Sequence, residues 1–132
     1  NANNILLPGK SKNMGNGWET RRRRGRGYDW ILLKLGLSGY PISFEINTHY
    51  FKGNYPDFFS VQAINHKKNI SINSIIKNSK KWQTIIANTK LKPDSSLKIK
   101  ILKKFYKKYN YIKLNIYPDG GISRFRVYGK IK

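Results

Sequence analysis

The sequence predicts an all-β protein, an antiparallel β-sandwich, on the basis of three observations. Short runs of alternating apolar and polar residues recur along the chain, segments rich in Gly and Pro separate these runs, and no stretch has a strong helical period. The 132 residues suit one domain spanning 1–132. A chain of this size buries roughly two thirds of its unfolded surface, which is enough for an ordinary apolar core.

The first half of the chain predicts three main strands. Residues 1–29 are rich in Gly, Asn and Arg and predict a loop, with one short strand at residues 4–7. A near-continuous apolar run over residues 30–37 predicts a buried strand. Residues 42–47 alternate and predict a second strand, and residues 58–65 predict a third after the turn-rich segment 53–57.

The middle of the chain is harder to assign. Residues 66–80 are polar and predict a surface loop, while residues 81–87 predict a short strand. Residues 97–102 alternate and suit either a strand or the start of a basic amphipathic helix. We favour the strand, because the period is two and Ile is β-branched.

The C-terminal residues have the clearest pattern. Residues 111–117 place Ile112, Leu114 and Ile116 on one face, and residues 118–121 form a Pro- and Gly-containing turn. The run 122–129 then places Phe125 and Val127 inward, with Arg124, Arg126 and Tyr128 outward. Two alternating runs around a short turn predict a β-hairpin. Loops at one end of such a fold carry function on a rigid frame, so the loop before residue 30 and the connection 47–57 are the candidate functional loops.

The net charge of +21 comes mostly from lysines that are scattered along the chain. They accompany abundant Asn and Ile, residue types that share A/T-rich codons, so we interpret them as a solvated surface and expect no nucleic-acid partner. The chain has no Cys, which excludes disulfides and thiolate metal sites. Its two His lack metal-ligand spacing, so we expect no metal. No apolar run approaches the roughly 20 residues of a membrane helix, so no membrane partner is expected.

The arginines are distributed differently from the lysines, in two clusters at residues 21–26 and 124–126. A guanidinium is a planar fork that captures a carboxylate or phosphate through two parallel hydrogen bonds. In a chain that uses lysine elsewhere, clustered arginine indicates a specific role.

Two acids and one His are candidate catalytic residues. Glu19 and Asp29 flank the first arginine cluster, where positive neighbours favour an ionised carboxylate that suits a general base. Salt bridging within the loop remains the alternative for both. His49 follows a predicted strand, with Lys52 and Asn54 close by, and suits acid–base chemistry near neutral pH. Turn formation explains Asp119 more simply, and His66 is assigned no role.

Four blocks, in order, resemble the allantoicase family: "MGNGWETRRRR", "YDWILLKLG", "INTHYFKGNYP" and "YIKLNIYPDGGISRFRVYG". The resemblance implies a jelly-roll β-sandwich similar to galactose-binding domains. Members of this family contain two related repeats. The chain matches one repeat and looks more like the second, so we expect a C-terminal fragment of a longer two-repeat chain.

The resemblance also implies an activity, the hydrolysis of allantoate to ureidoglycolate and urea in purine breakdown. Under this hypothesis Arg22 and Arg24 anchor the substrate carboxylate, with Arg21 and Arg23 as alternates. Glu19 or His49 transfers protons, and Lys52 and Asn54 contact the ureido oxygens. The expected partners are allantoate, the second repeat and further copies in a homo-oligomer. No cofactor is expected, and the expected location is the cytoplasm.

Two positions depart from the family pattern, which usually has Asp where this chain has Asn16 and Asn47. Asn keeps the shape but loses the charge and the basicity. Either these positions are structural, or this repeat is degenerate and inactive. Two other classes remain open: a non-catalytic sugar-binding module of galactose-binding-like type, and a basic nucleic-acid-binding domain, whose binding would weaken steeply with salt.

Overall fold

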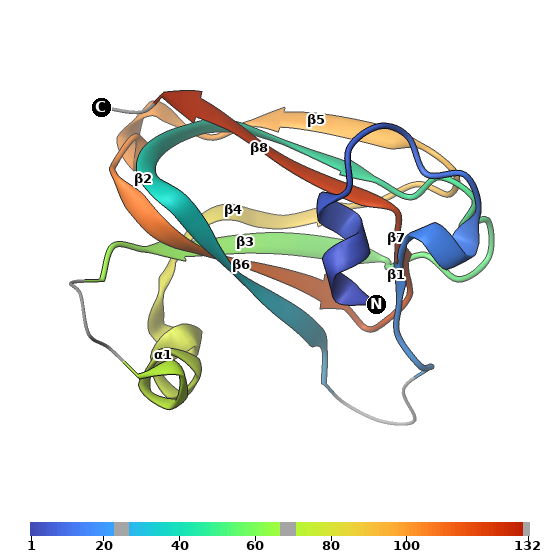
Figure 1. Cartoon of the computed structure of the whole chain (residues 1–132), viewed down its shortest axis with the longest axis horizontal. Helices are drawn as coiled ribbons and strands as arrows, with labels where there is room; N and C mark the ends of the chain where they lie inside the picture. The colour runs from blue at the N-terminus through green and yellow to red at the C-terminus, as the bar shows by residue number, and fades with distance from the viewer. Residues whose placement is uncertain (23–26, 67–70, 131–132) are drawn as a thin grey trace.

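Two antiparallel β-layers face each other across one apolar core in the computed structural model, which describes residues 1–22, 27–66 and 71–130 (Figure 1). One strand, β2 (Asp29–Asn47), belongs to both layers. Its first half pairs with β6, which pairs with β3, which pairs with β4. Its second half lies between β8 and β5. These partner strands are β3 (Phe58–Ile64), β4 (Gln83–Lys90), β5 (Ser96–Lys100), β6 (Tyr109–Tyr117) and β8 (Arg124–Lys130).

The continuity of β2 corrects the prediction of two separate strands over residues 30–37 and 42–47. The register with β6 shifts between Lys34 and Gly39, and the register with β8 shifts between Pro41 and Ser43. Such irregularities bend a strand and increase its twist without ending it. The interruption of the apolar pattern therefore marks a bend through which β2 passes from one layer to the other.

The core lies between the layers and confirms the predicted inward faces. Ile112, Leu114 and Ile116 of β6 are fully buried, and Phe125 of β8 stacks on Phe44 of β2 with ring centroids 5.6 Å apart. The strand predictions at residues 58–65, 81–87 and 97–102 correspond to β3, β4 and β5. The fold class predicted from alternation is confirmed.

The predicted hairpin at the C-terminus is wrong. β6 pairs with β2 and β3, whereas β8 pairs with the other half of β2, so the two strands lie in different layers. Between them, the short strand β7 (Gly121–Ile122) pairs with β1 (Trp18–Glu19) at one end of the sandwich. The turn at residues 118–121 and β7 therefore carry the chain from the layer of β6 to the layer of β8.

The predicted loop at residues 66–80 contains a helix, α1 (Ile72–Asn78), followed by the 3-10 turn η3 (Ser79–Lys81). The prediction failed because the polar composition hid two helical signals. Ser71 caps the helix by accepting a hydrogen bond from Ser74 N at 3.2 Å, and Ile75 packs inward. Of the predicted loop, residues 67–70 lie outside the described part of the chain.

η3 helps to cover the outer face of β6, where Lys113 is only 1% exposed. Lys113 Nζ donates to Ser79 Oγ at 3.2 Å and lies 5.1 Å from the centre of the Trp30 ring. Burial, with a smaller contribution from Lys80, lowers the pKa of this amine. Both faces of β6 are therefore buried, one by the core and the other by a polar and aromatic layer.

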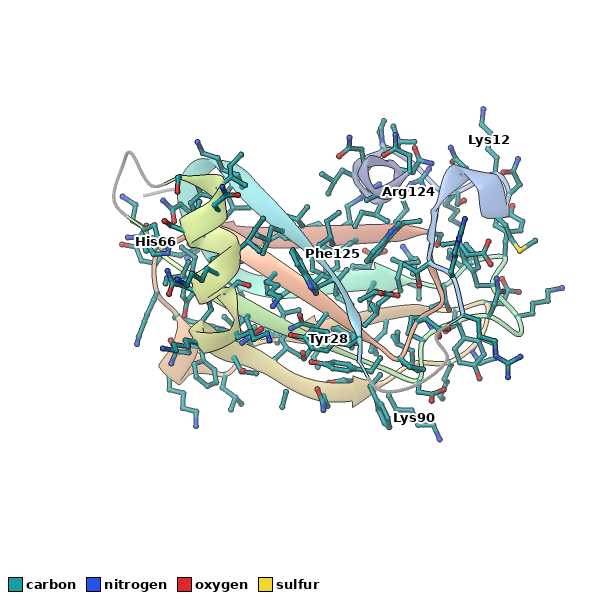
Figure 2. All side chains as sticks on the ribbon, turned by 90° about the horizontal axis from the view of Figure 1, so that it is seen from below. Lys12, Tyr28, His66, Lys90, Arg124 and Phe125 are labelled. Carbon is teal, nitrogen blue, oxygen red and sulfur yellow. The ribbon has the colours of Figure 1, made fainter. Side chains whose placement is uncertain are left out.

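The predicted strand at residues 4–7 is instead a 3-10 helix, η1 (Ala2–Leu6), whose Ile5 enters the core. Arg124, which alternation places outward, is 2% exposed because the N-terminal segment covers it (Figure 2). Two further 3-10 turns are η2 (Met14–Asn16) and η4 (Lys103–Phe105). Within the described ranges, no helix is long and apolar enough to cross a membrane.

Candidate functional site

A pocket of about 610 Å³ lies between three segments that are distant in sequence. Its volume is within the range of about 300–1,000 Å³ that is typical of small-molecule sites. The lining residues are Glu19, Thr20, Arg22, Gly53, Asn54, Tyr55, Asp57, Pro118, Asp119 and Gly120. They come from β1 and the residues directly after it, from the β2–β3 connection and from the turn before β7.

Hydrogen bonds of the main chain and of the Thr20 side chain hold these segments together. Thr20 N donates to Gly120 O at 3.0 Å, and Gly120 N donates to Thr20 Oγ1 at 3.0 Å. Gly121 N donates to Asn54 O at 2.7 Å. Gly120 has a φ of +130°, and a Cβ there would lie 2.7 Å from Pro56 N, so only Gly fits. The pocket walls are therefore fixed to each other by these hydrogen bonds.

The ring of Phe51 packs beneath the paired strands β1 and β7 and is fully buried. A Cβ added to Gly121 would lie 2.0 Å from two carbons of the Phe51 ring, and one added to Gly17 would lie 3.2 Å from the same ring. Glycine at both positions allows β1 and β7 to approach the ring closely. The pairing of Glu19 with Gly121 then places the Glu19 side chain at the pocket.

Three of the predicted site residues lie together in this pocket: Glu19, Arg22 and Asn54. Asn54 Nδ2 donates a hydrogen bond to Glu19 Oε2, which links β1 to the β2–β3 connection. Arg21 is exposed and does not line the pocket. Arg24 and its alternate Arg23 lie outside the described residues.

The other two predicted residues, His49 and Lys52, do not line this pocket. His49 is half-buried in the turn after β2, and Lys52 is exposed. This turn is fixed by Tyr50 N, which donates to Asp94 Oδ1 at 2.9 Å, and by Phe51 N, which donates to Thr48 O at 2.9 Å.

Sequence reasoning missed two acids of the pocket, Asp57 and Asp119. With Glu19, three of the six acids in the chain line this one cavity, although Lys and Arg number 27. The loop carrying Asp57 was predicted to be functional, but no signal singled out this residue. Its backbone is well fixed, because Asp57 N donates to Tyr117 O at 2.8 Å and Asp57 O accepts from Leu91 N at 3.0 Å.

The two family departures, Asn16 and Asn47, do not line the pocket. Asn16 Oδ1 accepts a hydrogen bond from Arg124 Nη2 at 2.5 Å. Asn47 is 7% exposed, and its Nδ2 donates to Glu45 Oε2 at 3.3 Å. Both asparagines therefore have structural contacts in this fold.

Glu45 lies on the outer face of β2, away from the pocket lining. Burial alone would raise the pKa of this carboxyl. Hydrogen bonds from Tyr128, Asn47 and Ser96, together with the charge of Arg126, more than offset burial and lower it. The hydrogen bond from Tyr128 to Glu45 also raises the pKa of the Tyr128 phenol.

The pocket combines a guanidinium, an amide and three carboxylates. The guanidinium suits a substrate carboxylate, and the carboxylates suit N–H donors and proton transfer. Among the residues that the structure describes, no group of three or more His, Asp or Glu is arranged to hold a metal ion. The donor set therefore fits a small polar molecule that carries both an anionic group and several N–H groups.

Comparisons with known proteins identify close relatives of the chain. The family model described as "Allantoicase repeat" matches residues 1–132. The chain is 42% identical to a probable allantoicase of Acinetobacter baumannii (strain ATCC 17978), over 97% of this chain and 38% of that protein. It is 40% identical to probable allantoicase 1 of Burkholderia mallei, over 98% and 38%. The chain therefore spans about two fifths of the length of these relatives.

Solved structures agree with this result. The crystal structure of allantoicase from Saccharomyces cerevisiae superposes with a TM-score of 0.81 at 33% identity, over 98% of this chain and 36% of that one. A chitosan-binding module from a Paenibacillus chitosanase/glucanase superposes with a TM-score of 0.63 at 18% identity, over 95% and 83%, which shows a shared fold alone. The architecture is thus the jelly-roll β-sandwich of galactose-binding-like domains, and the chain belongs to the allantoicase family, as one allantoicase repeat.

Proposed function

We propose that the protein containing this repeat hydrolyses allantoate to ureidoglycolate and urea. We further propose that this repeat binds the substrate in the pocket between β1, the β2–β3 connection and the turn before β7. The observation that carries the proposal is the convergence of Glu19, Arg22 and Asn54 on one cavity in a chain of the allantoicase family. The curated relatives that the chain matches are named as probable allantoicases.

Allantoate has one carboxylate and two ureido groups on a single carbon. Arg22 binds the carboxylate through its planar fork. Asn54 Nδ2 uses one hydrogen for Glu19 and retains a second for a ureido oxygen. Asp57 and Asp119 accept ureido N–H groups, since an ionised carboxylate can accept two parallel hydrogen bonds. This division of roles accounts for the mixed charge of the lining.

Hydrolysis replaces one ureido group with hydroxyl. Glu19 accepts a proton from water as the oxygen bonds to the central carbon and the C–N bond to the departing ureido group breaks. The same proton then passes from Glu19 to the nitrogen of the departing group, which leaves as neutral urea. Asn54 keeps the Glu19 carboxylate oriented during both transfers.

We propose that His49 and Lys52, which do not line the pocket, act from its rim or from a neighbouring subunit. The proposed role of Arg24, which lies outside the described residues, stays that of a second anchor for the substrate carboxylate. A second repeat and further copies of the chain are the proposed partners. Support comes from the family description as a repeat and from the share of about two fifths that the chain spans in its relatives. The proposed location is the cytoplasm.

The test is urea release from allantoate by the longest protein that carries this repeat and by the 132-residue chain. Glu19→Gln should lower kcat at least 100-fold with the fold intact, because a positioned general base contributes roughly 10²–10⁴-fold. Glu45→Gln is the matched control, since it removes the only other glutamate of the chain from the outer face of β2. Equal turnover in the two variants would remove Glu19 from the mechanism.

Arg22→Gln should raise KM for allantoate, and Lys90→Gln, which removes one positive charge from β4, controls for the change in net charge. Activity in the longest protein alone would place part of the site in the other repeat. No activity in either protein, with both folded, would contradict the proposed function.

A further inference from the structure

Arg124 at the start of β8 is only 2% exposed, and among the described residues its side chain makes an unusually large number of hydrogen bonds. Nε donates to Gly9 O at 3.0 Å, and Nη1 donates to Asn4 O at 3.1 Å and to Ser123 O at 2.6 Å. Nη1 also reaches Asn16 O at 2.6 Å, and Nη2 reaches Asn16 Oδ1 at 2.5 Å. Figure 2 shows Arg124 on the side that the N-terminal segment covers.

Asn16 receives two of these five hydrogen bonds, one on its backbone carbonyl and one on its side chain. It ends η2 and lies two residues before β1, so little chain separates the guanidinium from Glu19. Gly17, the first residue between them, is itself tightly packed, because a Cβ there would lie 2.7 Å from Ile122 O. A displacement of Asn16 would therefore pass directly to β1.

We infer that Arg124 is a positioning residue for the pocket: by fixing Asn16 it sets the place of β1, and through β1 the place of Glu19 and Thr20. The effect on turnover rests on the proposed function, whereas the effect on β1 does not. The guanidinium acts through the backbone at residues 16–20 and does not line the pocket itself.

Arg126 provides a matched comparison on the same strand. Its guanidinium holds the same N-terminal segment by donating to Ile5 O at 3.2 Å, to Leu7 O and to Gly9 O at 3.3 Å. These hydrogen bonds reach no further along the segment than Gly9, seven residues before Asn16. Loss of Arg126 therefore loosens the start of the segment, while loss of Arg124 also frees the residue that leads into β1.

The first experiment measures amide hydrogen exchange by mass spectrometry over residues 17–22 in the full chain. In the wild type, Thr20 N donates to Gly120 O, so this amide should exchange slowly. Arg124→Gln and Asn16→Ala should each raise the exchange rate of this segment about tenfold or more, and Arg126→Gln should leave it near the wild-type value. Asn16→Ala removes one acceptor only, so it keeps the test valid if Arg124→Gln fails to fold.

The second experiment measures kcat and KM for urea release in the longest protein that carries the repeat. Arg124→Gln should lower kcat by up to about 100-fold, because a misplacement of about 1 Å can cost that much. The double variant Arg124→Gln/Glu19→Gln should be no slower than Glu19→Gln alone, since residues that act as one unit are not additive.

Equal exchange over residues 17–22 in the Arg124 and Arg126 variants would overturn the inference, as would additive losses in the double variant. If the wild-type protein released no urea, the proposed function would fail. The exchange experiment would still decide the role of Arg124 at β1.

Discussion

The close approach of Gly121 to Phe51 makes Gly121→Ala a sharp test of how the pocket is supported. The added methyl carbon would lie 2.0 Å from two carbons of the Phe51 ring, whereas carbon atoms in ordinary contact lie about 3.5–4.0 Å apart. The ring would have to move by about 1.5 Å. Phe51 is fully buried, so its neighbours would have to move as well.

Overpacking of a buried site costs about 1–3 kcal/mol, and the short distance favours the upper value. An unfolding entropy of about 2.1 cal/mol/K per residue over the 132 residues converts about 3 kcal/mol into a fall in Tm of about 11 °C. Differential scanning calorimetry measures this directly. Gly53→Ala is the control, because nothing lies within 4 Å of the Cβ position there. It should change the free energy of unfolding by less than about 1 kcal/mol.

A second variant tests the stated cause. Phe51→Leu in the Gly121→Ala background shortens the side chain that the methyl group meets. The double variant should therefore lose less stability than the sum of the losses in the two single variants, by about 0.5–3 kcal/mol. Equal Tm values for Gly121→Ala and Gly53→Ala, or strictly additive losses in the double variant, would refute the reasoning.

Three further predictions concern polar side chains that make hydrogen bonds within the fold. The pKa of Lys113 is lowered, so the folded state loses this proton at a lower pH than the unfolded state does. The free energy of unfolding should therefore rise with pH between the lowered pKa and the ordinary lysine value. Lys113→Met should flatten that rise, measured by urea unfolding from pH 8 to 10. Asn16→Asp should raise the free energy of unfolding by about 1 kcal/mol at pH 7, because the bond to Arg124 becomes charge-assisted, and the gain should vanish at pH 3. Asn47→Asp should instead lower the free energy of unfolding at pH 7, because it replaces a hydrogen-bond donor to Glu45 with a second carboxylate. Acidification should restore part of the loss. A stability equal to that of the wild type would contradict this account.

Alternation predicted the strands and their inward faces well, because the period of a strand is a local property. Ile112, Leu114 and Ile116 are buried as expected. Pairing partners are not local, and so the hairpin between β6 and β8 was predicted wrongly, although each strand was placed correctly.

The helix α1 could have been found from its sequence. Ser71 precedes Ile72, Ile75 and Ile76, which have the spacing of one helical face, and Ser71 caps the helix. The polar composition around these residues masked the signal. The burial of Arg124 had no comparable signal, because it depends on where the N-terminal segment folds back.

The candidate site was predicted in part. The blocks that carry the family resemblance contain Glu19, Arg22 and Asn54, and the fold brings all three to one cavity. Asp57 and Asp119 join them only because the segments before β3 and β7 close against each other. That closure is a property of the tertiary structure, so neither acid could be recognised from its neighbours in the sequence.

The sharing of β2 between both layers has a consequence for synthesis on the ribosome. Every strand that pairs with β2 follows it in the chain, and its first half pairs with β6, about eighty residues later. As β2 leaves the exit tunnel, its hydrogen-bonding edges have no partners, and they are completed only when the last strands emerge. A nascent chain that stalls before Tyr109 therefore exposes a long apolar strand edge, the kind of surface that chaperones bind and that seeds aggregation.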